Sequence, residues 1–134
     1  MGYDLYGIKA KSQKGEYFRN NVWWWRKLWT FICLVSPDIL SAQDMQKGHW
    51  NNGDEITEQQ AEFIAKRLKE TLKNGQAQQF SKDVQNSIKK AKHNNKNLKF
   101  GEKGWDYNDS YPFSLKNLKE FITFCENSGG FTIF

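Results

Sequence analysis

The chain has 134 residues, of which 38% are hydrophobic and 16% aromatic, and its formal net charge is +5. This length is typical of one domain, so residues 1–134 are predicted to fold as a single unit. The mean hydropathy of -0.83 comes from abundant Lys, Asn and Gln, whereas the aromatic residues each bury a large area and supply a core. This composition excludes a wholly disordered chain.

The first third of the chain predicts a strand and then two helices. The opening YDLYGIKA is short and partly alternating, which predicts a strand, and the polar KSQKGE predicts a turn. From Phe18 to Val35 the apolar residues have a dense helical spacing. Pro37 cannot continue that helix but suits the first turn of another. The segment SPDILSAQDM is therefore predicted to be a short helix with Ser36 as its cap.

Two longer helices are predicted in the middle of the chain, after a loop with the sequence QKGHWNNGDEI. Thr57 and Gln60 form a capping-box pattern that begins a helix near Glu58, and Asn74-Gly75 ends it. A second helix follows at once, so the pair predicts a helical hairpin. The apolar stripes at helical spacing are Ala61, Ile64, Ala65, Leu68 and Leu72 in the first helix and Ala77, Phe80, Val84, Ile88 and Ala91 in the second.

The last third begins with a long Asn-, Gly- and Lys-rich segment, HNNKNLKFGEKGWDYNDSYPF, in which extended stretches are expected. Ser114 then caps a helix that NSGG ends, and its apolar face carries Leu118, Phe121, Ile122 and Cys125. The final FTIF predicts a strand, which we expect beside the DLYGI strand. The predicted fold class is α+β, predominantly α, with four to five helices and a small sheet of short N- and C-terminal strands.

The tryptophan-rich stretch NNVWWWRKLW, residues 20–29, cannot form one aromatic surface on a helix. Successive helical residues are about 100° apart, so three adjacent rings spread over about 200°. This projection places Trp24, Trp25 and Trp29 in the core. It places Trp23 with the cations Arg19, Arg26 and Lys27. Trp and Arg are favoured anchors at interfaces, so this group is a candidate partner-binding surface, and the alternative is that the terminal strands bury Trp23.

The positive charge of the chain is concentrated in residues 82–103. That segment has seven lysines against Asp83 and Glu102 and alone carries a net charge of +5, so the remainder is neutral. On a helix, the lysines predicted to share one face are Lys82, Lys89, Lys92 and Lys96. Such a face suits an acidic protein or the phosphates of nucleic acid, which position a protein without reading sequence. The alternative is an ordinary solvated helix face.

Signals for enzyme chemistry are sparse. His49 lies in the QKGHWNNGDEI loop, and with Trp50 and Asp54 it is the candidate ligand-binding site of an alternative interpretation. There is no phosphate-binding loop, no nucleophile elbow and no zinc-ligand spacing. We therefore predict that the protein is not an enzyme and uses no metal or cofactor.

The predicted location is the cytoplasm, with reduced thiols. The chain opens with MGYDLYGIKA, which has neither a secretory pattern nor a myristoylation signal. Its longest apolar stretch is interrupted by Arg26, Lys27 and Thr30, which excludes a membrane span. Cys33 and Cys125 both lie near apolar helix faces, where inert burial is favoured over nucleophilic chemistry.

Four stretches resemble a family of small bacterial and phage proteins with no assigned function. They are GYDLYG, GEYFRNNVWWWRKLW, GHWNNGDEIT and YPFSLKNLKEFITFCENSGGFTIF, which span both ends and the central loop but not the lysine-rich middle. The most specific of them is YFRNNVWWWR. The chain departs from the family at Lys27, where Pro is frequent, and at Phe134, where Cys is common. It also lacks a cysteine-rich insertion found in some members, so no metal role carries over.

This resemblance implies a small, non-enzymatic binding protein of phage or mobile-element type. The function we expect is anti-CRISPR-like inhibition of a host nucleic-acid-guided defence complex, through the basic helix face. The partner would be a host protein or ribonucleoprotein complex, with contact to its RNA, in the bacterial cytoplasm. The first alternative is an accessory protein that binds RNA or DNA directly. The second is a small-ligand protein or enzyme that uses the His49 loop.

Overall fold

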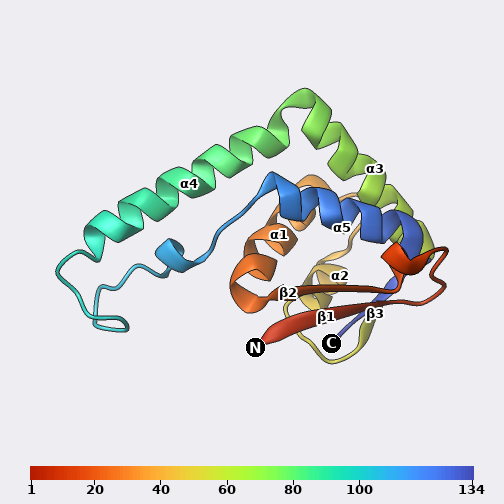
Figure 1. Cartoon of the computed structure of the whole chain (residues 1–134), viewed down its shortest axis with the longest axis horizontal. Helices are drawn as coiled ribbons and strands as arrows, with labels where there is room; N and C mark the ends of the chain where they lie inside the picture. The colour runs from red at the N-terminus through yellow and green to blue at the C-terminus, as the bar shows by residue number, and fades with distance from the viewer.

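The structure is a computed structural model that describes all 134 residues, and it shows an α+β fold with five helices and a four-stranded antiparallel sheet (Figure 1). This architecture confirms the predicted fold class. In chain order the elements are β1 (Gly2–Gly7), η1 (Gln13–Gly15), β2 (Tyr17–Asn21), α1 (Val22–Val35), α2 (Ala42–Lys47), β3 (Asp54–Ile56), α3 (Glu58–Asn74), α4 (Gln76–Asn94), η2 (Tyr107–Ser110), α5 (Leu115–Ser128) and β4 (Phe131–Ile133).

The sheet joins the two ends of the chain. Its strand order is β2-β1-β4-β3, so the first and last strands are its central pair. Leu5 of β1 lies opposite Ile133 of β4, which confirms the predicted pairing of DLYGI with FTIF. Ile133 also lies opposite Asp54. The interpretation of residues 54–56 as loop was therefore wrong, because pairing with β4 holds this polar segment extended.

Local capping signals place three helix ends as predicted. The Thr57 hydroxyl accepts from the Gln60 backbone N–H while the Gln60 side chain accepts from that of Thr57, which completes the predicted capping box. Gly75 has a φ of 86°, a left-handed conformation that favours glycine, and it separates α3 from α4. The Ser114 hydroxyl caps α5 by accepting from the Asn117 N–H.

Two predicted helix boundaries were wrong. Residues 18–21 belong to β2 rather than to the start of a helix, because Phe18 pairs with Leu5 and packs into the core. Helix α1 begins only at Val22, capped by the Asn21 side chain. Residues 36–40 form a turn rather than a helix, with the N–H groups of residues 39 and 40 both bonded to the carbonyl of Ser36.

Helix α2 begins later than predicted, and its cap is Ser41 rather than Ser36. The Ser41 hydroxyl accepts from the Asp44 N–H, and the Asp44 carboxylate accepts from the Ser41 N–H. This second capping box has an Asp in place of the Glu or Gln of the usual pattern.

The core lies between one face of the sheet and helices α1, α3 and α5. Trp25 and Trp29 are stacked at a centroid distance of 5.4 Å. Their indole N–H groups donate to the carbonyls of Gly48 and Met45, both at 2.7 Å, so these buried donors have partners. We refer to this part of the molecule as the body.

Helix α4 extends away from the body as an arm (Figure 1). The chain turns back after Asn94 and runs beneath the helix toward α5, through turns and η2 and without a strand. We define the arm as residues 76–112. None of the helices combines the length and the apolar character needed to cross a lipid bilayer.

Candidate nucleic-acid interface

The arm carries an uncompensated positive charge. All seven of its lysines are exposed, and none forms an ion pair or a side-chain hydrogen bond: Lys82, Lys89, Lys90, Lys92, Lys96, Lys99 and Lys103. In the body, by contrast, Lys11, Lys47 and Lys69 each pair with a carboxylate. The lysine side chains of the arm are therefore exposed to the solvent and accessible to a polyanion.

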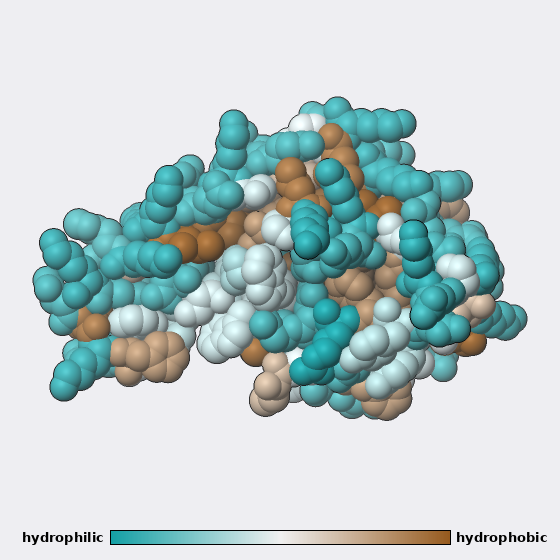
Figure 2. Space-filling view, in the orientation of Figure 1, coloured by the Kyte–Doolittle hydropathy of each residue, from teal (hydrophilic) through white to brown (hydrophobic).

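Three of the four predicted interface lysines lie on α4. Lys82 and Lys89 are on the side of the helix opposite the buried Val84, whereas Lys92, predicted to share that face, lies about 80° from Val84 at the edge of the apolar side. Helix α4 ends at Asn94, so Lys96 lies in the turn that follows rather than on the helical face. The basic surface consequently continues past the helix into the returning segment, and Figure 2 shows this part of the molecule as teal with pale and brown patches between.

Aromatic packing fixes the base of the arm. The Phe80 ring of α4 contacts those of Phe31 in α1 and Phe113 just before α5, with both centroid distances at 4.8 Å. Phe31 is fully buried. These contacts join α4 to the body on two sides, so the arm is held in place where it begins.

Asn95 fixes the far end of the arm. This residue is only 5% exposed, and its side chain makes three hydrogen bonds across the turn. Its Nδ2 donates to the Asp106 carbonyl at 2.8 Å and to an Asp109 carboxylate oxygen at 3.0 Å, and its Oδ1 accepts from the Asp106 N–H at 2.8 Å. The returning segment is thereby tied to the end of α4.

An aromatic cluster at the end of the arm was missed from the sequence. Phe100 lies 5.4 Å from Trp105 and 5.8 Å from Tyr107 between ring centroids, and Phe100 is 67% exposed. The signal was present in KNLKFGEKGWDY, where aromatic residues alternate with lysines. That interleaving is typical of surfaces that bind single-stranded nucleic acid.

Trp23 is covered by the arm rather than by the terminal strands. It is half-buried, its ring lies 4.9 Å from that of Tyr111, and the Arg26 guanidinium lies 5.8 Å from the Tyr111 ring. Lys27 Nζ lies 3.5 Å from Asn108 Oδ1. Three members of the predicted partner-binding group are thus close to the returning segment.

Arg19 does not belong to that group, because it lies in β2 and not on the helix. Its guanidinium donates to both carboxylate oxygens of Asp4, at 2.8 and 2.9 Å. Tyr17 donates to the same carboxylate, and these hydrogen bonds hold the pKa of Asp4 below its usual range. The predicted Arg19–Trp23 proximity depended on a helix that starts four residues too early.

Trp24 was predicted to be in the core but is only half-buried. It lies in the first turn of α1, directly after β2, where neighbouring elements do not enclose the ring. Instead it borders a shallow hollow together with Asn20, Ser114, Lys116, Asn117 and Glu120. Trp25 and Trp29, each 1% exposed, are in the core as predicted.

The predicted ligand-binding loop lines none of the main hollows of the surface. His49 and Trp50 are exposed and Asp54 is half-buried in β3. The contact made by His49 is through its backbone carbonyl, which accepts from the Tyr3 hydroxyl at 2.9 Å. None of the three main hollows of the surface includes any of these three side chains.

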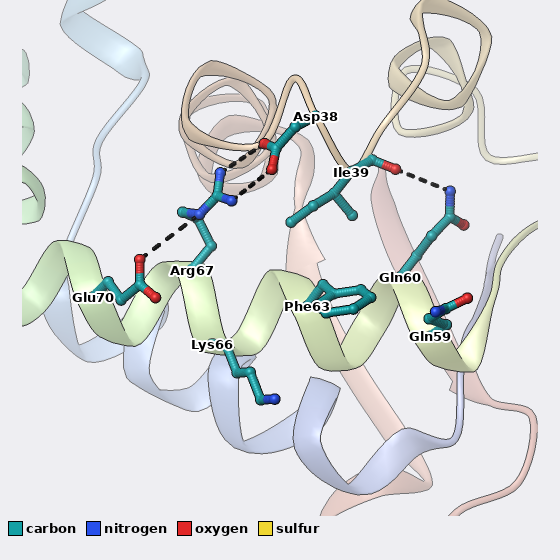
Figure 3. Close-up of a pocket in the computed structure, with 8 residues that line it drawn as sticks. All are labelled: Asp38, Ile39, Gln59, Gln60, Phe63, Lys66, Arg67 and Glu70. Carbon is teal, nitrogen blue, oxygen red and sulfur yellow. Dashed lines mark hydrogen bonds and ion pairs between the residues drawn. The ribbon is translucent and has the colours of Figure 1, made fainter.

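The largest of those hollows, about 600 Å³, lies between α3 and the 36–40 turn (Figure 3). Arg67 pairs with the Asp38 carboxylate at 2.7 and 2.8 Å and also donates to the Val35 carbonyl at 2.6 Å. These hydrogen bonds lower the pKa of Asp38 to about 2. Arg67 thus satisfies Asp38 and fastens the turn that follows α1, whereas Lys66, which also lines the hollow, has no carboxylate partner.

The two cysteines are free thiols within the apolar packing. Cys33 is half-buried and Cys125 is buried. Burial raises the pKa of the Cys33 thiol to about 11 and that of Cys125 well above its ordinary value, so both stay protonated at neutral pH. No group of three or more His, Cys, Asp or Glu side chains is arranged to hold a metal ion.

No protein-family model, curated protein or solved structure matches this chain. No relative therefore assigns a role to any of its residues. The basis for a functional proposal is the chemistry of the arm.

Proposed function

We propose that this protein is a non-enzymatic binding protein of phage or mobile-element type. Through the lysines of the arm it would contact the RNA of a host nucleic-acid-guided defence complex and inhibit that complex in the bacterial cytoplasm. The observation that carries the proposal is the set of seven exposed, unpaired lysines on an arm that projects from the body. The anti-CRISPR-type setting is an analogy of small size, basic charge and phage context.

Electrostatics favours the nucleic acid, rather than the protein groove that binds it, as the surface contacted. Grooves that bind nucleic acid are lined by Lys and Arg, so a basic face would be repelled from them. Phosphates are the complementary charge, and each lysine that approaches one releases condensed counterions. The lysines of the arm would therefore lie against the RNA backbone.

The spacing of the lysines suits a run of phosphates. Lys82 and Lys92 are ten residues apart on α4, which at 1.5 Å per residue is about 15 Å. Phosphates along one strand of a duplex advance by roughly 3.4 Å each, so this stretch corresponds to about four phosphates. Lys96, Lys99 and Lys103 extend the surface beyond the helix.

The test is binding of the purified protein to bare RNA, bare DNA and a reconstituted guide complex, measured by fluorescence anisotropy. The variant Lys89→Glu with Lys92→Glu is expected to lose most of the binding and to flatten its salt dependence. For single strands the slope of log K against log salt is about -0.7 per phosphate contact. A matched control is Lys14→Glu with Lys119→Glu, which changes the net charge equally at two exposed positions of the body.

The outcomes separate the inhibitor from the accessory protein. Inhibition of the guide complex that depends on Lys89 and Lys92 supports the proposal. Binding to bare nucleic acid without any inhibition favours the accessory RNA- or DNA-binding protein, because the same lysines serve both. Absence of binding to all three probes at low salt contradicts both functions.

A further inference from the structure

The end of the arm exposes the ring of Phe100 to the solvent. Phe100 is the most exposed aromatic side chain of the chain, at 67%. Trp105 and Tyr107 meet it at interplanar angles of 68° and 84°, so neither ring is stacked over it. A large apolar ring held by its neighbours but open to solvent is available to a planar partner.

Hydrogen bonds fix the backbone that carries this ring. The Glu102 carboxylate accepts from the Lys99 N–H at 3.0 Å, and the Glu102 N–H donates to the Lys99 carbonyl at 3.0 Å. The Trp105 N–H donates to the Glu102 carbonyl at 3.0 Å. With the Asn95–Asp106 bonds, these contacts preorganise the display of Phe100 before any partner arrives.

Three lysines and three acidic residues, Glu102, Asp106 and Asp109, lie near the ring in the chain. Lys99 adjoins Phe100, with Lys96 and Lys103 close by in the chain, and all three are exposed and unpaired. The nearby carboxylates are occupied within the turn: Asp106 accepts from Asn108, and Asp109 from Asn95 and Ser110. The lysine side chains are therefore the charged groups near the ring that remain without a partner and can contact an anion.

We propose that the end of the arm is a stacking platform for unpaired bases of a single-stranded nucleic acid. One base stacks on the open face of Phe100, and Lys96, Lys99 and Lys103 hold the adjoining phosphates. This inference rests on the proposed function and names its substrate class. The ring can stack on the π-face of a base, and the neighbouring lysines can contact the negatively charged phosphate of the same nucleotide.

The geometry selects a single strand over a duplex. In a duplex each base is already stacked on its neighbours, so its face is not available to a side chain. Unpaired bases in loops, bulges and ends expose their faces and stack on aromatic rings with little dependence on sequence. Single-stranded RNA and DNA share this chemistry.

The experiment measures the affinity of the full chain for a 12-nucleotide oligouridine, a 12-nucleotide oligodeoxythymidine and a 20-base-pair RNA duplex. Phe100→Ala is expected to weaken binding of the single strands by roughly 5- to 150-fold and to leave duplex binding within about twofold. Phe100→Trp restores the affinity. The matched control Phe63→Ala removes another exposed ring, on α3 in the body. It is expected to change neither the affinity for single strands nor that for the duplex.

The results distinguish this inference from the proposed function. If Phe100→Ala has no effect on single strands while Lys89→Glu with Lys92→Glu abolishes binding, the platform is refuted and the basic arm stands. If the wild-type protein binds no probe and no guide complex, both are refuted. If Phe100→Ala weakens binding of the oligouridine or the oligodeoxythymidine but not of the duplex, the platform is supported. The oligonucleotide that the wild-type protein binds more tightly indicates whether the natural ligand is RNA or DNA. An unchanged thermal unfolding curve for Phe100→Ala verifies that the fold is intact.

Discussion

The body holds the buried aromatic core and all the ion pairs of the structure, whereas the lysines of the arm have no ion-pair partner and its end exposes an aromatic ring. Trp25 and Trp29 lie in the core with both indole N–H groups bonded, and Arg67 is held by Asp38. At the end of the arm, Phe100 faces the solvent beside unpaired lysines. Under the proposed function, stability would depend on the body and recognition on the arm, so mutations should affect one without the other.

The largest expected effect is in the body, at Trp25→Ala. This change removes a ring that is 1% exposed and stacked on Tyr3 and Trp29, and it leaves the Gly48 carbonyl without its donor. Comparable core truncations cost about 3–5 kcal/mol in the free energy of unfolding. Urea denaturation followed by circular dichroism measures the loss.

Trp50→Ala is the matched control, because it removes the same side chain from a position that is 61% exposed. Its expected cost is within about 0.5 kcal/mol. Equal costs at positions 25 and 50 would contradict the assignment of the core to the body.

The second effect is confined to the arm, at Asn95→Ala. Loss of its three hydrogen bonds, each contributing about 0.5–1.5 kcal/mol, is expected to release the returning segment from α4. Amide hydrogen exchange should accelerate in residues 96–110 and stay unchanged in the sheet. The exposed neighbour Asn97→Ala serves as control, and faster exchange throughout β1 and β4 would show that the two regions are not separable.

The smallest effect is acid destabilisation of the body. Bonds to Lys47, Ser41 and Gln60 lower the pKa of Asp44 to about 2, and Arg67 does the same for Asp38. The unfolded carboxyls take up protons near pH 4 and the folded ones only near pH 2. The unfolded state therefore binds more protons in this window, and stability falls as the pH drops through it.

Asp44→Asn is expected to flatten the pH dependence of unfolding between pH 4 and pH 2. Denaturant midpoints measured at half-unit intervals would reveal it. Asp83→Asn on α4, where the carboxylate has no cationic partner, should leave the slope as it is. Equal flattening by both variants would contradict the role of the ion pairs in the body.

Local signals in the sequence were sufficient for much of the fold. The Thr57–Gln60 box, the Ser114 cap and the left-handed Gly75 all act within a few residues, so reading them requires no knowledge of the rest of the chain. The wrong boundaries have a non-local cause. Phe18 suits a helix as well as a strand, and its pairing with Leu5 decides between them.

The candidate site divides in the same way. The lysines were identifiable from charge spacing, since exposure of a lysine needs no tertiary explanation. The aromatic cluster was not, because Phe100 and Tyr107 meet only after the chain turns back, and Asn95 bonds to Asp106 to hold that turn. Likewise, Trp23 is partly covered by Tyr111, which lies 88 residues further along the chain, so the contact could not be predicted from neighbouring residues.

The position of β4 in the sheet has a consequence for how the protein comes to be folded. The strand that follows all the others in the chain lies between β1 and β3. As the chain leaves the ribosome, β1 and β2 can pair early. Until β4 is available, one edge of β1 and the backbone of β3 have no strand to pair with. Such open edges invite pairing with other chains. We therefore expect completion of this sheet to be a slow and aggregation-prone step of folding, because it requires Phe131–Ile133.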